Sequence, residues 1–179
     1  MLNANERAVL NDWVRAVAPR AIAYARSLLG RSSADPEDVV QEAFLRVLRH
    51  ARDYDLPNDG VKILFRTVSN LCINASVRAR NMASLETGGP EDGPMAVADE
   101  SLPLPEEIVA GRELEARLNR AMAGLPELQR AALELRALGQ GKQAIAEILE
   151  ITESHAGVLV HRARQTLAGL LASDLKEQE

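Results

Sequence analysis

The sequence predicts an all-α protein in which two small helical domains are joined by a flexible acidic linker. Apolar residues recur at helical spacing, and no run of β-branched residues alternates with polar ones as it would in a strand. Aromatic residues make up only 3% of the chain against 46% hydrophobic residues, so the cores must be aliphatic and rich in alanine. A stretch rich in Pro, Gly and acidic residues interrupts the helical pattern in the middle of the chain.

Charge divides the chain into three parts. Residues 1–80 hold 12 Lys and Arg against 9 Asp and Glu, residues 81–118 hold 2 against 9, and residues 119–179 hold 7 against 8. We therefore predict domains at 1–82 and 109–179 with a linker at 83–108. As a flexible coil, residues 81–104 would span about 27 Å, enough for the domains to occupy separate sites. The linker is either a solvated spacer or a polyanion that competes with nucleic acid for a basic channel.

The first domain opens with two expected helices, over about Asn5–Val17 and Pro19–Leu29. They complete a small helical bundle in which Trp13 and Tyr24 are expected to lie in the core.

A third helix is expected from Asp35 to about Arg52, because Asp35 can cap it and Pro36 suits the first helical position. Helical spacing divides its residues between two faces. The apolar face comprises Val40, Ala43, Phe44, Val47 and Ala51, and the charged face comprises Asp38, Gln41, Glu42, Leu45, Arg49 and Arg52. Leu45 on the charged face is either a chance exposed residue or the apolar centre of a protein-docking surface.

Residues 53–60 contain Pro, Asn, Asp and Gly and predict a loop, which is followed by a helix over about Lys62–Asn81. The core face of this helix comprises Leu64, Val68, Leu71 and Ala75, and Cys72 is expected to be a small buried residue. A polar stripe comprises Arg66, Asn70, Asn74, Arg78 and Asn81. Asparagine disfavours a helix but can bond base edges, so the stripe is either a nucleic-acid contact or a polar face without a role.

The second domain has the pattern of a helix-turn-helix. Helices are expected over Pro126–Leu138 and Lys142–Leu149, followed by a turn at Glu150–Thr152 in which Thr152 caps the next helix. The inward residues of the first are Leu128, Ala131, Ala132, Leu135 and Leu138, and those of the last are Ala156, Val160, Ala163 and Leu167. The last helix presents Ser154, Val158, His161 and Gln165 outward, flanked by Arg162 and Arg164. This fits a helix that reads a major groove, although three-helix units also occur as plain packing modules.

Several classes of protein are not expected. The three histidines and the single cysteine form no pattern for a metal site, a disulfide or a catalytic triad, and no phosphate loop is present, so we expect neither an enzyme nor a cofactor. No apolar stretch is long enough to span a membrane, and the polar start does not resemble a signal peptide. We expect a cytoplasmic protein without membrane insertion.

Five segments, in order and over nearly the whole chain, resemble the extracytoplasmic-function (ECF) group of bacterial sigma factors in the sigma-70 family. These segments are DPEDVVQEAFLRVL at 35–48, LFRTVSNLCIN at 64–74, LPELQR at 125–130, IAEIL at 145–149 and HRAR at 161–164. Each is a weak motif alone, but five in sequence around an acidic linker are a strong signal.

The resemblance implies a promoter-specificity factor with two helical domains, regions two and four. It implies docking on the clamp coiled coil of core RNA polymerase, through Asp38, Gln41, Glu42, Leu45, Leu48 and Arg49, and a further contact with the polymerase flap. It implies opening and reading of the minus-10 promoter element by Arg66, Asn70, Asn74, Arg78 and Arg80. It implies reading of the minus-35 element by Ser154, His155, Val158, His161, Arg162, Arg164 and Gln165. An anti-sigma partner is also implied.

Three positions depart from the family pattern. Asn74 stands where aspartate is common, Ile63 replaces a common tryptophan, and residues 157–159, Gly-Val-Leu, stand where many relatives carry basic or hydroxyl residues. Few direct hydrogen bonds to bases are then expected from the last helix. Two other functions remain open: a sigma-like mimic that sequesters an anti-sigma factor, and a stand-alone helix-turn-helix repressor. The near-neutral second domain argues against the repressor, since duplex binding alone relies on many Lys and Arg contacts.

Overall fold

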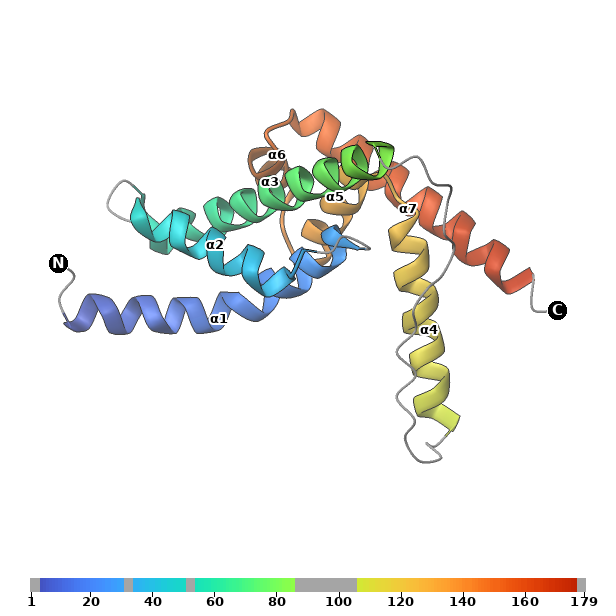
Figure 1. Cartoon of the computed structure of the whole chain (residues 1–179), viewed down its shortest axis with the longest axis horizontal. Helices are drawn as coiled ribbons and strands as arrows, with labels where there is room; N and C mark the ends of the chain where they lie inside the picture. Colours follow the sequence, from blue (N-terminus) through green and yellow to red (C-terminus); the bar gives the residue numbers. More distant parts are fainter. Residues whose placement is uncertain (1–3, 31–33, 51–53, 86–105, 177–179) are drawn as a thin grey trace.

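The computed structural model describes residues 4–30, 34–50, 54–85 and 106–176, within which the chain forms seven α-helices and no strand (Figure 1). The helices are α1 (Ala4–Leu29), α2 (Pro36–Arg49), α3 (Leu56–Leu85), α4 (Glu106–Ala123), α5 (Glu127–Ala137), α6 (Lys142–Leu149) and α7 (Glu153–Lys176). The all-α prediction is confirmed. None of the helices in these ranges is long and apolar enough to cross a bilayer.

Helices α1, α2 and α3 pack on one another and form the first half of the molecule. Tyr24 is buried, as expected, and its hydroxyl lies 2.7 Å from that of the buried Ser69. Its ring meets that of Phe65 edge-on at 5.2 Å between centroids. Trp13 is only half-buried, and it meets Phe44 edge-on at 5.6 Å. The two aromatic pairs therefore join α1 to both other helices of this half.

The prediction of two helices before residue 30 was wrong, because α1 is continuous with Pro19 inside it. Proline removes one backbone hydrogen bond and disfavours a helix interior. Here the buried face continues across Pro19, from Val17 to Ala21 and Leu28. Packing of this face against α2 and α3 outweighs the local cost of the proline.

The predicted loop at 53–60 was also wrong, because α3 already begins at Leu56. Asp55 starts the helix: its carbonyl accepts from the amide of Asp59 at 2.7 Å, and its carboxylate accepts from the side-chain amide of Asn58 at 2.7 Å. Pro57 lies in the first turn, where an amide hydrogen is not needed.

Two further boundaries differ from the prediction. Helix α3 continues to Leu85, so residues 81–85 of the predicted coil are helical, consistent with the helix-forming Met, Ala and Leu that they contain. The rest of that coil, 86–104, lies outside the described residues. Helix α2 ends at Arg49 rather than Arg52, and residues 51–53 are also outside the described ranges.

The second half comprises α4 to α7, and α5 and α6 have nearly the predicted bounds. Helix α4, for which no element was expected, projects from the body of the molecule in Figure 1 and packs on α7 near its own C-terminal end, where Ala121 and Met122 are buried. Leu128 was wrongly placed inward, since it is 38% exposed. Leu159 is buried beside Ala156 and Ala163, so the inward face of α7 is wider than predicted.

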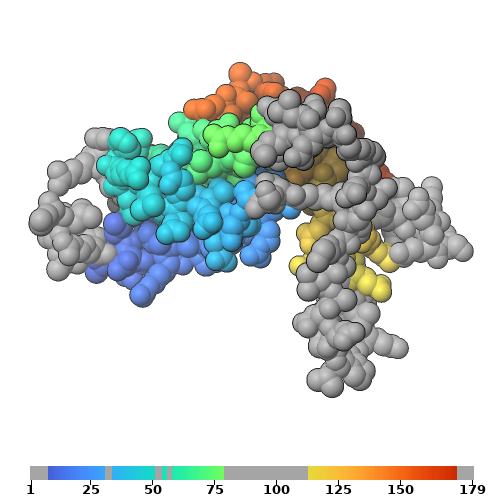
Figure 2. Space-filling model, in the orientation of Figure 1, coloured from blue at the N-terminus to red at the C-terminus, as the bar shows by residue number. Residues whose placement is uncertain are grey.

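The two halves are in contact, since α1 packs on α5 and α3 packs on α6. In the space-filling view, orange atoms of the helix-turn-helix lie directly against green atoms of α3 (Figure 2). Buried residues of both halves form one apolar cluster, which extends from Val17 in α1 to Leu159 in α7. The contact holds the helix-turn-helix beside α3.

Arg130 of α5 connects the halves from within. It is 8% exposed, and its guanidinium donates to the carbonyl oxygens of Ser27 and Leu28, each at 3.3 Å, near the end of α1. It also donates to the carbonyl oxygens of Ala123, the last residue of α4, and of Leu125 in the turn that follows, at 2.9 and 3.0 Å. Burial lowers the pKa of this guanidinium from its usual value. The charge is held by the negative ends of two helix dipoles.

Candidate polymerase and nucleic-acid interface

The predicted docking face lies on the outside of α2. Asp38, Gln41 and Arg49 are exposed, Leu45 is 45% exposed, and Glu42 and Leu48 are half-buried. Arg46 adds to this face by an ion pair of 2.7 Å with Glu42, and that hydrogen bond lowers the pKa of the Glu42 carboxyl. An exposed leucine with charged neighbours has the composition of a protein-docking patch.

Local sequence explains why this face points outward. Asp35 caps α2 as predicted, because its carboxylate accepts from the amide of Glu37 at 2.7 Å. The opposite face is buried against α1 and α3, and comprises Val40, Ala43, Phe44 and Val47. Since these four positions follow the helical repeat, Leu45 has no place in the core.

The predicted asparagine stripe lies on the surface of α3. Asn70, Asn74 and Arg78 are exposed, whereas Arg66 is half-buried. The side chain of Arg80 lies outside the described residues, as does that of Asn81. The opposite face carries Phe65, Val68 and Cys72, which are buried with Ser69, so the core fixes the direction of the stripe. The exposed amides can both donate to and accept from base edges.

A pocket of about 340 Å³ lies between the docking face and the stripe. Its lining includes Tyr54, Arg46, Arg49 and His50 beside the predicted Arg66 and Asn70. Tyr54 is 41% exposed, and such a ring can stack on an unpaired base while neighbouring cations contact phosphates. We did not predict Tyr54 because it lies within the segment 53–60 that we expected to be a loop. The only signal in the sequence was that this aromatic residue closely follows Arg49, His50 and Arg52. Such a pattern has no helical period and does not by itself predict a binding residue.

The predicted minus-35 face is exposed throughout its length. It comprises Ser154, His155, Val158, His161, Arg162, Arg164 and Gln165 on α7. Leu159, which belongs to the core, is not part of this face. Gly157 lies under Lys142 of α6, and a Cβ at this position would be 3.3 Å from the Lys142 Cε. This atom belongs to the far end of a flexible side chain that can move, so the contact does not by itself require a glycine inside the helix.

The turn of the helix-turn-helix has the predicted cap. Thr152 accepts a hydrogen bond from the amide of His155 at 3.2 Å, so it starts α7 as expected. Glu150 ends α6 in the left-handed conformation with φ of 57°, a position that usually favours glycine. The turn fixes the angle at which the exposed face of α7 leaves α6.

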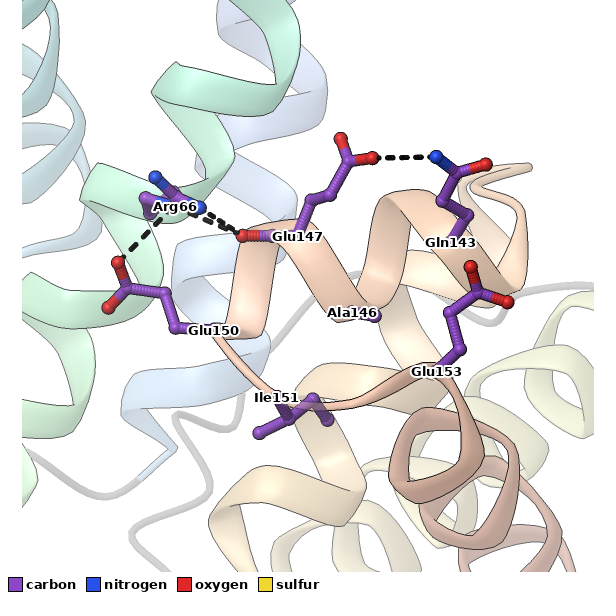
Figure 3. A pocket seen from close by; sticks show the side chains of 7 residues that line it. All are labelled: Arg66, Gln143, Ala146, Glu147, Glu150, Ile151 and Glu153. Atoms are coloured by element: carbon purple, nitrogen blue, oxygen red, sulfur yellow. Dashed lines mark hydrogen bonds and ion pairs between the residues drawn. The ribbon is translucent and has the colours of Figure 1, made fainter.

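Arg66, alone among the described residues of the stripe, is occupied by the other half of the molecule (Figure 3). Its Nε and Nη2 donate to the carbonyl oxygen of Glu147 at 3.1 and 2.5 Å, and its Nε lies 3.7 Å from the carboxylate of Glu150. Lys62, one turn earlier on α3, donates to the Glu147 carboxylate at 2.9 Å. The sequence did not predict these contacts.

The described residues contain no group of three His, Cys, Asp or Glu side chains that could hold a metal ion. Cys72 is buried as expected, and burial raises the pKa of its thiol to about 12. A thiol in this state is a poor nucleophile, so its surroundings suit packing rather than chemistry.

Two family matches cover the regions that carry these faces. Residues 13–81 match sigma-70 region 2, which includes the docking face of α2 and the stripe of α3. Residues 115–167 match sigma-70 region 4, which includes the helix-turn-helix.

Individual relatives and a solved structure agree with these matches. The ECF RNA polymerase sigma factor SigE of Mycolicibacterium smegmatis is 32% identical over 176 residues, which are 96% of this chain and 66% of SigE. The ECF sigma factor SigW of Bacillus subtilis is 29% identical over 139 residues, 74% of this chain and 73% of SigW. The fold resembles that of the sigma factor RpoE in complex with the anti-sigma factor NepR from Bartonella quintana, with a TM-score of 0.68, 22% identity and coverage of 92% of this chain and 98% of the other. The chain spans about two thirds of the length of SigE, and it belongs to the ECF group of the sigma-70 family.

Proposed function

We propose that this chain is a promoter-specificity subunit that binds core RNA polymerase and directs it to a set of promoters. The observation that carries the proposal is the arrangement of three outward faces on α2, α3 and α7, each backed by a buried apolar face. These faces supply docking, capture of a melted strand and contact with an upstream duplex. The subunit needs no chemistry of its own, because polymerase forms the phosphodiester bonds. It acts where polymerase acts, in the cytoplasm.

Each face has side chains suited to its task. On α2, Leu45 offers an exposed apolar contact beside Arg49, and arginine is enriched among the residues that dominate binding energy at protein interfaces. On α3, Asn70 and Asn74 can bond unpaired bases. On α7, Arg162 and Arg164 flank the reading residues and suit phosphate contacts, while Val158 can contact a thymine methyl group.

An anti-sigma factor is part of the proposal. The similar RpoE structure holds the anti-sigma factor NepR, and membership of the same family supports a partner of that class here. Such a partner would need to cover at least one of the three faces in order to block promoter use.

Run-off transcription on fragmented genomic DNA tests the function. Purified core polymerase with the chain should yield discrete transcripts that core polymerase alone does not yield. Binding to core polymerase without any promoter-dependent transcript would favour the sigma-like mimic. Tight binding to a promoter duplex in the absence of polymerase would favour the repressor, because tethering to polymerase would then be unnecessary.

A further inference from the structure

Lys62 and Arg66 form a pair of cations, one turn apart, at the start of the asparagine stripe. Their partners from outside α3 are negative oxygens at the end of α6: the Glu147 carboxylate, the Glu147 carbonyl and the Glu150 carboxylate. Within α3, Lys62 also lies 3.8 Å from the carboxylate of Asp59. The Glu147 carbonyl is one of the last four of α6, which have no partner within a helix and carry the negative end of its dipole. A nucleic-acid backbone would present negative oxygens to the same cations.

Glu150 gives an independent reason to assign a role to this contact. It is the only described residue other than glycine with a positive φ, and a side chain makes this conformation less favourable than glycine would. The backbone therefore favours glycine at a position that holds a glutamate. The carboxylate lies next to Arg66 and lines a pocket of about 460 Å³ with Glu147 and Glu153 (Figure 3).

The contact is suited to being broken. The side chains of Lys62 and Glu147 are 39% and 40% exposed, and that of Glu150 is 59% exposed. Ion pairs with this much access to water are weak and are screened by salt. The hydrogen bond between Lys62 and Glu147 raises the pKa of the lysine and lowers the pKa of the glutamate. Both side chains therefore stay charged near neutral pH.

We propose that Glu147 and Glu150, which we call the α6 latch, compete with the DNA backbone for Lys62 and Arg66 in the free chain. This inference rests on the proposed function and concerns the regulation of the same site. While the latch is closed, the cations at the start of the stripe are occupied by the helix-turn-helix, and the helix-turn-helix is held beside α3. Occupation of Lys62 and Arg66 by phosphates requires the end of α6 to move away. The latch therefore limits strand capture before polymerase separates the two halves.

The test compares the full-length chain with the variant Glu147→Gln/Glu150→Gly. Glycine suits the backbone at 150, so the variant is expected to fold, which circular dichroism and a melting curve would check. The probe is a fluorescein-labelled, random-sequence, single-stranded DNA of 12 nucleotides at low salt, because phosphate contacts do not depend on sequence. If the closed form holds about four fifths of the free chain, its complete loss would tighten binding about fivefold. The variant should reach part of this gain, because the Glu147 carbonyl remains as a partner of Arg66.

Two controls isolate the latch from net charge. Glu113→Gln/Glu115→Gln removes the same number of charges from exposed positions on α4, and should change the affinity less than twofold. Adding Lys62→Gln and Arg66→Gln to the latch variant should abolish the gain, because the gain must pass through those cations.

Equal affinity of the wild-type chain and the latch variant for the probe would overturn the inference. So would an equal gain in the α4 control, or a gain that survives without Lys62 and Arg66. Run-off transcription by the wild-type chain separates this failure from failure of the proposed function. A chain that directs transcription but shows no latch effect would remain a sigma factor without this device.

Discussion

The two proposed DNA-contacting faces differ in how the free chain presents them. On α7 all seven predicted residues are exposed, whereas on α3 the stripe begins with an arginine bound to the end of α6. Both faces are outward faces of amphipathic helices, and the difference comes from the packing of α3 on α6. A duplex-contacting face is therefore ready in the free chain, while the strand-capturing face is partly covered by the other half.

Loss of polymerase docking should prevent either face from acting at a promoter, because both depend on polymerase to reach it. We expect Leu45→Asp/Arg49→Ala to weaken binding to core polymerase about a thousandfold, since two central interface residues contribute about 2 kcal/mol each. Fluorescence anisotropy with labelled chain would measure it. The matched control, Val9→Ala/Arg15→Ala, removes an exposed apolar residue and an exposed arginine from α1 and should bind normally. Unchanged binding by the α2 variant would remove these residues from the docking role.

Loss of the buried arginine should loosen the contact that makes the faces differ. Arg130→Met leaves carbonyl oxygens of both halves without their donor, and we expect the free energy of unfolding to fall by about 3 kcal/mol. Urea unfolding would measure it, with Arg120→Met, an exposed arginine of α4, as the control. Similar stability of the two variants would show that Arg130 is not a structural link.

The salt dependence of duplex binding should report the phosphate contacts made by the exposed face of α7. In holoenzyme, Arg162→Gln and Arg164→Gln should each lower the slope of log affinity against log salt for the upstream duplex by about 1, with a modest loss of affinity. Arg15→Gln on α1 should leave the slope unchanged. Slopes that do not change in the α7 variants would exclude them as phosphate contacts.

The smallest expected effect concerns the turn that joins the faces. Glu150→Gly alone relieves the left-handed backbone and should raise the free energy of unfolding by about 1 kcal/mol. Thermal and urea unfolding would measure it, with Glu153→Gly, at the start of α7, expected to be destabilising. A destabilised Glu150→Gly variant would mean that the carboxylate contributes more to the fold than its conformation costs.

The parts of the fold that local pattern determines were predictable. Helices α5 and α6, the Thr152 cap and the buried face of α2 follow from apolar spacing and from capping residues within a few positions. The continuous α1 was missed, because Pro19 disfavours a helix interior while the packing that supports this helix joins residues far apart in the sequence. The early start of α3 was missed although its signals are local: Asp55 contacts Asn58 and Asp59, and Pro57 suits a first turn.

The site was predictable to the same extent. The outward residues of α2, α3 and α7 follow from helical period, and the described ones are exposed or half-buried. The contact of Arg66 with Glu147 joins residues 81 positions apart, and that of Arg130 with Leu28 joins residues 102 apart. No periodicity relates such pairs. The roles of the individual site residues stay predictions that the variants test.

Permanganate footprinting of promoter complexes most directly tests the claim that the two faces perform separate steps. With holoenzyme at saturating concentration, Asn74→Ala should keep the promoter bound but lower the reactivity of minus-10 thymines about tenfold, as expected for the loss of one good base contact. Arg162→Ala should lower promoter occupancy and leave the reactivity of each bound complex unchanged. Two variants that impair the same step would contradict the account.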